Sequence, residues 1–145
     1  MRTREQDRSL ACWRALTSRF GEDYAAWREG RQDEAAYLAA VKKTASRIYV
    51  SGLGPAIAFL RSRKKPINGL LADDLAALAL AGMGSPPQGI TLPVAEGSSL
   101  DLIRRIREAT DVATVAWATE EALAACTWLM RYLEGAGVSP SEDEE

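Results

Sequence analysis

The sequence predicts an all-α fold, arranged as a single compact bundle of about five or six helices with one long irregular loop. Alanine, which has the strongest helix propensity, occurs 25 times among the 145 residues. Apolar residues recur at steps of three and four positions, whereas the alternation of apolar and polar residues that is typical of strands is almost missing. A chain of this length needs only one hydrophobic core, so we expect one domain.

The first helix is predicted to begin at Thr3, because Thr3 and Gln6 have the spacing of a capping box. Gly21 interrupts the apolar series that follows without changing its phase, so we expect one continuous helix, bent at most, that ends at Gly30. The side chains predicted to face inward are Leu10, Trp13, Thr17, Phe20, Tyr24 and Trp27.

Two further helices are predicted between Asp33 and Pro66. Asp33 can cap the first of them, which ends at Ser51 and Gly52. Pro55 suits the first turn of the second helix, which is short and apolar and ends before Pro66. The side chains of the longer helix that are expected to face the core are Leu38, Val41, Ala45 and Ile48.

A fourth helix is predicted from the leucines at residues 70–78, and Gly82 ends it. Asp73 and Asp74 lie near its beginning, where the helix dipole favours acids. Residues 82–98 contain four glycines and three prolines and therefore predict a long irregular loop. Loops of more than about 12 to 15 residues in a compact domain are usually functional or mobile.

Two more helices complete the prediction. Ser98 opens a short helix that extends to Arg107, and Asp111 caps a long one that ends at Gly135. The inward stripe of the long helix is Val112, Val115, Thr119, Ala122, Cys126, Leu129 and Leu133. Residues 138–145 end in four acids, which is typical of a disordered tail, so we assign residues 1–137 to the folded domain.

Composition argues against several classes of function. The chain has no histidine, the commonest acid-base side chain near neutral pH and the commonest metal ligand. Its two cysteines lie far apart in the sequence and are interpreted as buried apolar residues. Three pairs of adjacent acids begin at Glu22, Asp73 and Glu120; neighbours on a helix diverge by about 100°, so we interpret these acids as surface charge. We therefore expect no enzyme activity, metal or cofactor, and a cytoplasmic protein without a membrane span.

Positive charge is concentrated in residues 42–65, which contain seven Lys and Arg residues, while residues 35–72 contain no acid. The chain carries a net charge of −2, so this concentration is a local feature. Lys43 and Arg47, or Arg61 and Lys65, have the spacing that places two cations side by side on a helix. Such cations repel each other, and either a polyanion or distant acids brought close by folding would relieve the repulsion.

Two passages resemble a known family. Residues 42–65, "KKTASRIYVSGLGPAIAFLRSRKK", are similar to a helix, Gly-Leu turn and Ala-Phe-Leu helix in the small subunit of type III-B CRISPR effector complexes, the Cmr module. Residues 118–136, "ATEEALAACTWLMRYLEGA", resemble the closing helix of that family. The two passages cover about a third of the chain and occur in the family's order.

This resemblance implies an all-α, noncatalytic subunit. Members of the family stack beside the RNA-guided backbone subunits and support guide and target RNA through a basic surface that does not read sequence. The resemblance therefore implies as partners the other subunits of the complex, guide or target RNA, and further copies of the chain. The residues expected to form the RNA-binding surface are Lys42, Lys43, Arg47, Arg61, Arg63, Lys64 and Lys65.

Two other functions remain open from the sequence alone. Two helices that meet at a glycine-containing turn between Tyr49 and Pro55 are compatible with a helix-turn-helix DNA-binding regulator. The second of these helices, however, is almost wholly apolar and offers few side chains that could read bases. A helical adaptor that binds only protein is the other alternative, with Trp27 and Trp117 as candidate anchors, although core positions suit both residues better.

Overall fold

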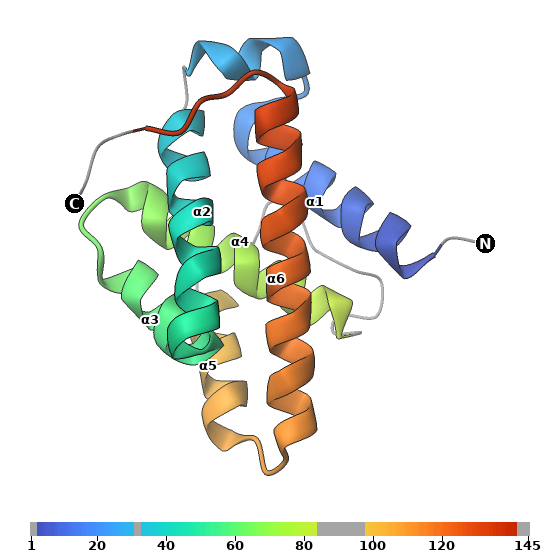
Figure 1. The fold of residues 1–145 in the computed structure, drawn as a ribbon, viewed down its shortest axis with the longest axis vertical. Helices are drawn as coiled ribbons and strands as arrows, with labels where there is room; N and C mark the ends of the chain where they lie inside the picture. Colours follow the sequence, from blue (N-terminus) through green and yellow to red (C-terminus); the bar gives the residue numbers. More distant parts are fainter. Residues whose placement is uncertain (1–2, 31–32, 84–97, 142–145) are drawn as a thin grey trace.

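The computed structural model describes residues 3–30, 33–83 and 98–141, and within these ranges the chain is all-α, as predicted. In Figure 1, α2 and α6 run side by side along the molecule, with α4 crossing behind them. The predicted loop falls largely on residues 84–97, which lie outside the described residues. The helices are α1 (Arg4–Phe20), the 3₁₀ helix η1 (Tyr24–Glu29), α2 (Glu34–Ser51), α3 (Leu53–Ser62), α4 (Pro66–Gly82), α5 (Ser98–Glu108) and α6 (Val112–Gly135).

The prediction of one continuous helix from Thr3 to Trp27 was wrong. The capping box of Thr3 is present, but α1 ends at Phe20 because Gly21 adopts a φ of 92°, outside the helical region. The chain then turns into η1, which ends at Gly30 as expected. Trp27 is fully buried in this arrangement, and its indole Nε1 donates to the carbonyl oxygen of Gly21 over 3.0 Å. The spacing of the apolar residues therefore predicted correctly that Trp27 faces the core, although the helix is broken at Gly21.

The core forms around α4, which packs against α1, α2, α3, α5 and α6. Small residues such as Ala72, Ala76 and Ala79 are completely buried in α4 and let neighbouring helices approach closely. Cys12 and Cys126 are buried free thiols, as predicted, and burial raises the pKa of Cys126 to about 12. None of the described helices is long and apolar enough to cross a membrane.

The interpretation of the adjacent acids as surface charge was wrong for Asp73 and Asp74. Asp74 is 1% exposed and accepts hydrogen bonds from the guanidinium of Arg19 on α1, at 2.6 and 3.2 Å, and from the hydroxyl of Tyr37 on α2, at 2.8 Å. Burial raises the pKa of Asp74, against the opposing effect of Arg19. Asp73 accepts from the backbone N–H and hydroxyl of Ser99, at 2.9 and 2.6 Å, and thereby joins α4 to α5.

The same interpretation was wrong for Glu121 of α6, which is buried between α1 and α4. Its carboxylate accepts hydrogen bonds from Arg4 and from Arg8, the latter at 2.6 and 3.1 Å. Burial alone would raise the pKa of Glu121, but these hydrogen bonds outweigh it and lower the pKa. Gly82 of α4 leaves the space for this side chain, because a Cβ there would lie 2.9 Å from Cγ of Glu121.

The start of α2, the exposure of Val112 and the end of the packed region differ in detail from the prediction. Asp111 caps α6 through its side chain as expected, whereas Asp33 occupies the cap position of α2 without a side-chain hydrogen bond. Val112 is 84% exposed although it was expected to face inward. Val138 is buried and the N–H of Ser141 donates to the carbonyl of Ala35 over 3.0 Å, so packing extends past residue 137. Residues 142–145 lie outside the described residues.

Replacing Glu121 with Ala should lower the free energy of unfolding by about 1.5–3 kcal/mol, because Arg8 loses the buried carboxylate that accepts two of its hydrogen bonds and keeps only the exposed Glu5 and Glu120. The matched control is Glu120→Ala, which removes an acid that is 66% exposed and lies 3.5 Å from the same arginine. The control should change stability by about 0–1 kcal/mol. Urea denaturation of the two variants measures both values, and equal losses would contradict the assignment.

The contribution of Glu121 should also depend on pH. Its pKa is lower in the folded chain than its ordinary value of 4.5, so the unfolded chain binds the proton more tightly. The contribution is therefore fully present above pH 4.5 and is lost as the pH falls through the lowered, folded-state pKa. Urea titrations of wild type and Glu121→Ala should accordingly converge in acid, whereas a gap that stays constant would show that charge is not involved.

Replacing Gly82 with Ala should destabilise the chain by about 1–3 kcal/mol, because the new methyl group overlaps Glu121 and displaces it from its arginines. Gly69 provides the control in the same helix, since a Cβ there meets no atom within 4 Å. Gly69→Ala should stabilise the chain by about 0.5–1 kcal/mol, the usual gain in a helix interior. Thermal denaturation of both variants checks the opposite signs.

Candidate nucleic-acid interface

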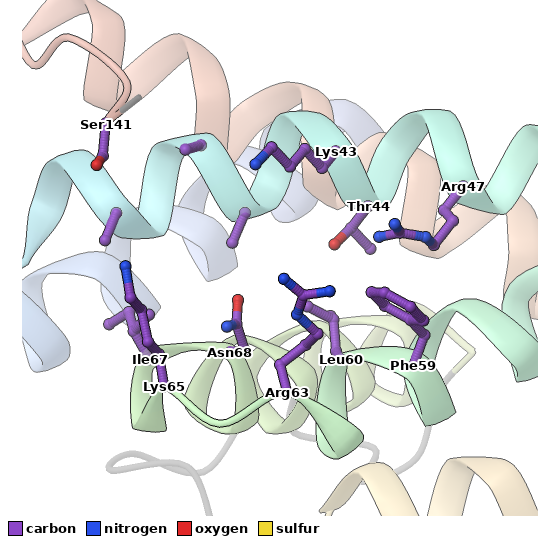
Figure 2. A pocket seen from close by; sticks show the side chains of 13 residues that line it. Lys43, Thr44, Arg47, Phe59, Leu60, Arg63, Lys65, Ile67, Asn68 and Ser141 are labelled. Carbon is purple, nitrogen blue, oxygen red and sulfur yellow. The ribbon is translucent and has the colours of Figure 1, made fainter. Parts of the chain in front are cut away.

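A basic hollow of about 260 Å³ lies between α2 and the segment that joins α3 to α4. Figure 2 shows cationic side chains on both of its walls, with Lys43 and Arg47 on α2 opposite Arg63 and Lys65. We call these four residues and the space between them the basic hollow. Among the described residues that line it there is no acid; the others are Ala36, Ala39, Ala40, Thr44, Phe59, Leu60, Ile67, Asn68 and Ser141.

Local backbone geometry explains which cations reach the hollow. Lys43 and Arg47 are four residues apart on α2 and therefore share one helix face. Beyond α3 the chain is extended, with φ and ψ of −74° and 150° at Arg63 and of −70° and 129° at Lys65. Side chains alternate in extended backbone, so Arg63 and Lys65 fall on the same side and the exposed Lys64 falls on the other.

Phe59 holds the two arginines of the hollow together. The guanidinium carbon of Arg47 lies 3.6 Å from the centroid of its ring, and that of Arg63 lies 5.0 Å from the same centroid. Guanidinium groups are attracted to aromatic faces, and stacking leaves their N–H groups directed outward in the plane. Phe59 therefore orients two cations from different segments toward the same space, as Figure 2 shows.

Thr44 places a hydroxyl group at the wall of the hollow. The residue is 1% exposed, and Oγ1 has no hydrogen-bond partner within the described structure. A buried polar group without a partner costs about 1–3 kcal/mol. Such a group at the wall of a cationic hollow is suited to donate a hydrogen bond to an anionic ligand.

Three of the seven predicted RNA-binding residues lie outside the hollow. Lys42 points to the other side of α2 and forms an ion pair of 2.9 Å with Glu134 of α6. Arg61 faces α5, where it donates to the hydroxyl of Ser99 over 2.8 Å and lies 3.9 Å from Asp73. Acids distant in sequence lie beside these two cations, and the RNA-binding role expected of Lys42 and Arg61 stays a prediction that the basic hollow does not include. Lys64 is exposed and does not line the hollow.

Four acids of α4 and α6 lie away from the hollow. Asp74 and Glu121 lie in the interior, where arginines of α1 bind them. Glu134 neutralises Lys42 at the surface, and Asp73 lies beside Arg61. The core and the helix contacts thus use these four acids, and none of them is among the described residues that line the hollow.

Sequence reasoning missed Phe59, Thr44 and Asn68 as components of the hollow. Phe59 was interpreted only as part of an apolar helix, because its contact with Arg47 depends on how the chain turns at Gly52. Thr44 precedes Arg47 by three positions, which is a helical spacing that could have indicated the shared face. Asn68 lies in the first turn of α4 and gives no comparable signal.

The alternative functions receive little support from the geometry. α3, the recognition helix of the helix-turn-helix alternative, buries Leu53, Ala56, Ile57 and Leu60 against the core. Trp27 is buried and cannot anchor a partner, whereas Trp117 is 44% exposed. The described residues contain no group of three or more side chains suited to hold a metal ion.

Comparison with known proteins identifies the family. The family described as CRISPR-associated protein (Cas_Cmr5) matches residues 4–136, which include both passages of the sequence resemblance. A crystal structure of a CRISPR-associated Cmr5 family protein from Thermus thermophilus has a TM-score of 0.64 and 26% identity, over 93% of this chain and 97% of that chain. No curated protein matches. This chain therefore belongs to the Cmr5 family, the small subunit of the type III-B CRISPR effector complex that its two passages resemble.

Proposed function

We propose that this chain is a noncatalytic, cytoplasmic structural subunit that binds the backbone of guide or target RNA through the basic hollow. Family membership makes it a subunit of a type III-B CRISPR effector. The observation that carries the RNA assignment is the convergence of Lys43, Arg47, Arg63 and Lys65 on one space that no described acid borders.

The chemistry of the hollow favours phosphate over other ligands. Two guanidinium groups can each offer paired N–H donors to phosphate oxygens, and the two ammonium groups add charge without a fixed direction. Phe59 pre-orients both guanidinium groups, which reduces the side-chain entropy lost on binding. The hydroxyl of Thr44 can donate a further hydrogen bond to a phosphate oxygen.

Backbone contacts of this kind carry no sequence information. In an RNA-guided complex, base pairing with the guide provides specificity, and the protein supports the shape and charge of the strand. The hollow exposes a single polar amide, that of Asn68, beside its cations, so it offers few groups to read base edges. A subunit that supports guides of any sequence requires affinity for the RNA backbone that does not depend on the bases.

Exposed apolar side chains offer surfaces for the other subunits and for further copies of the chain. Tyr49 and Val50 at the end of α2 are 78% and 85% exposed, and Val112 at the start of α6 is 84% exposed. Both helix ends lie at the same end of the molecule in Figure 1. None of these residues lines the hollow, and they suit contacts between neighbouring subunits while the hollow faces RNA.

Charge neutralisation at two adjacent lysines tests the RNA assignment. Lys65→Gln removes a cation from the hollow and should reduce the slope of log affinity against log salt by about 0.7 to 0.9, the value for one phosphate contact. Lys64→Gln removes the same charge one residue away, outside the hollow, and should leave the slope unchanged. Fluorescence anisotropy of labelled RNA with the assembled complex measures both slopes.

A stronger variant extends this test to both walls of the hollow. Lys43→Glu, Arg47→Glu and Lys65→Glu together should weaken RNA binding at physiological salt and leave assembly with the other subunits intact. Unchanged RNA affinity in the triple variant, or identical slopes for the two lysine variants, would remove RNA binding at the hollow from the proposal. Gel filtration of the reconstituted complex verifies assembly.

A further inference from the structure

We propose that an aromatic groove between α1 and α6 binds an arginine side chain of another subunit of the effector complex. The aromatic groove has a volume of about 670 Å³ and shares no described lining residue with the basic hollow. Neither lysine nor arginine occurs among the described residues that line it. The inference rests on membership of the complex and does not depend on RNA binding. The side chains that form the groove include Glu5, Ser9, Leu10, Trp13, Trp128 and Tyr132.

Three aromatic rings form a continuous wall across the junction of the two helices. The ring centroids of Trp13 on α1 and Tyr132 on α6 are 5.3 Å apart, and those of Tyr132 and Trp128 are 5.6 Å apart. Each of the three side chains is only partly buried, so the wall remains accessible from the groove. Aromatic faces carry partial negative charge and attract cations, and Trp does so most strongly.

The wall is held in place before any partner binds. Trp13 packs against the hydrophobic core, and the hydroxyl groups of Tyr132 and Ser9 are hydrogen-bonded to each other. The indole Nε1 of Trp128 donates to the carboxylate of Glu5 over 2.9 Å. Every ring therefore has a contact that fixes its orientation, and little side-chain entropy is lost on binding.

Glu5 places a carboxylate at the wall. Its side chain is 58% exposed and accepts hydrogen bonds from Arg8 over 2.6 Å and from Trp128 over 2.9 Å. These two hydrogen bonds lower the pKa of Glu5, so the carboxylate is charged at neutral pH. A carboxylate offers about four acceptor sites, so Glu5 can accept further hydrogen bonds from a donor that enters the groove.

The ion pairs around Glu5 leave a surplus of negative charge. Two arginines of α1 contact three acids; the arginines are Arg4 and Arg8, and the acids are Glu5, Glu120 and Glu121. Two positive charges face three negative ones, so this network carries one negative charge in excess. A cation that enters the groove beside Glu5 therefore neutralises the network, whereas an anion would be repelled.

The combination of aromatic faces and a carboxylate fits arginine better than lysine. A guanidinium group is planar, stacks on aromatic rings and presents paired N–H donors to a carboxylate, whereas an ammonium group is a compact and strongly hydrated charge. The methylene stem of arginine can also cover apolar surface, such as that of Leu10. Tryptophan, tyrosine and arginine are the residues that contribute most to binding at protein interfaces. The expected partner is therefore a segment in which an arginine lies beside apolar residues.

Two small probes test the recognition of a guanidinium group by the isolated chain. N-acetyl-arginine amide carries this group, and N-acetyl-citrulline amide has the same length with a neutral urea in its place. In nuclear magnetic resonance titrations the arginine probe should shift the indole N–H resonances of Trp13 and Trp128. It should bind about three- to thirtyfold more tightly than the citrulline probe, the range for one cation–π contact. Equal affinity for both probes, or no shift with either, would overturn the proposal.

A pair of charge variants tests the role of the carboxylate. Glu5→Gln keeps the shape of the side chain, and Asp7→Asn removes an exposed acid outside the groove. Both acids lie in the first turn of α1, so the loss of a favourable interaction with the helix dipole is matched. Glu5→Gln should weaken binding of the arginine probe by about two- to fivefold, the usual effect of one exposed ion pair. Asp7→Asn should not, and an equal effect of the two substitutions would contradict the role of Glu5.

Incorporation into the complex tests whether the groove holds a subunit contact. Trp128→Ala should weaken binding of the chain to a complex reconstituted without it by about tenfold or more, as expected when an interface tryptophan is removed. Trp117→Ala is the control, because Trp117 is 44% exposed on the same helix and does not line the groove. Glu5→Gln should lower incorporation in the same direction without a loss of packing. Incorporation of Trp128→Ala and Glu5→Gln at the level of the wild type would refute the contact.

Photo-cross-linking identifies the occupant of the groove in the assembled complex. Leu10→photo-leucine keeps the apolar side chain at the wall and reacts only with atoms that touch it. A cross-link to an arginine-containing peptide of another subunit supports the proposal, whereas a cross-link to a second copy of this chain or to RNA would refute it.

Failure of this inference can be distinguished from failure of the proposed function. If Lys65→Gln weakens RNA binding while the groove variants incorporate normally, the basic hollow binds RNA and the groove holds no subunit. If the groove variants lose incorporation while no substitution in the hollow changes RNA affinity, the groove contact stands and the RNA assignment falls.

Discussion

The hydrogen bond between Tyr37 and Asp74 fixes the two walls of the hollow relative to each other. Tyr37 belongs to α2 and Asp74 to α4, and both side chains are at most 1% exposed. A buried carboxylate that lost this donor or Arg19 would keep a desolvated charge without full compensation, which is strongly unfavourable. The spacing between α2 and the α3–α4 segment is therefore set from inside the molecule, by a contact that solvent and salt hardly reach.

Helix periodicity predicted most of the fold because it reports which face of a helix is buried. It predicted the inward stripe of α6 around Cys126, and the glycine after α2 marked its end correctly. Helix periodicity also indicated that Asp74 is buried, but the prediction did not use this indication. Asp74 falls between Leu71 and Leu78 at helical spacing, on the same stripe, and the presence of a charge led to a surface interpretation. The length of an apolar stripe, in contrast, does not show whether the helix that carries it is continuous. The break at Gly21 was therefore missed.

The hollow was only partly predictable, because charge density along a sequence does not determine direction in space. Seven cations lie within residues 42–65, yet Lys42 and Lys43 point to different sides of α2 and only the latter reaches the hollow. What separates them is the rotation of about 100° per residue in a helix and the alternation in extended backbone. A search for cations four apart in α2 and two apart before Pro66 would have selected Lys43, Arg47, Arg63 and Lys65, together with Arg61, which faces α5 instead.

A compact cluster on a nearly neutral body also has consequences for a subunit that works within an assembly. Under the proposed function each hollow offers few phosphate contacts, so we expect an isolated chain to hold RNA weakly and in a salt-dependent manner. When subunits are arranged along one strand, every further contact becomes intramolecular, and the combined affinity rises far above that of one hollow. Weak individual sites are then an advantage, because free RNA does not saturate the unassembled subunit. The proposed function would thereby restrict strong RNA binding to the complex, where a guide has already chosen the sequence.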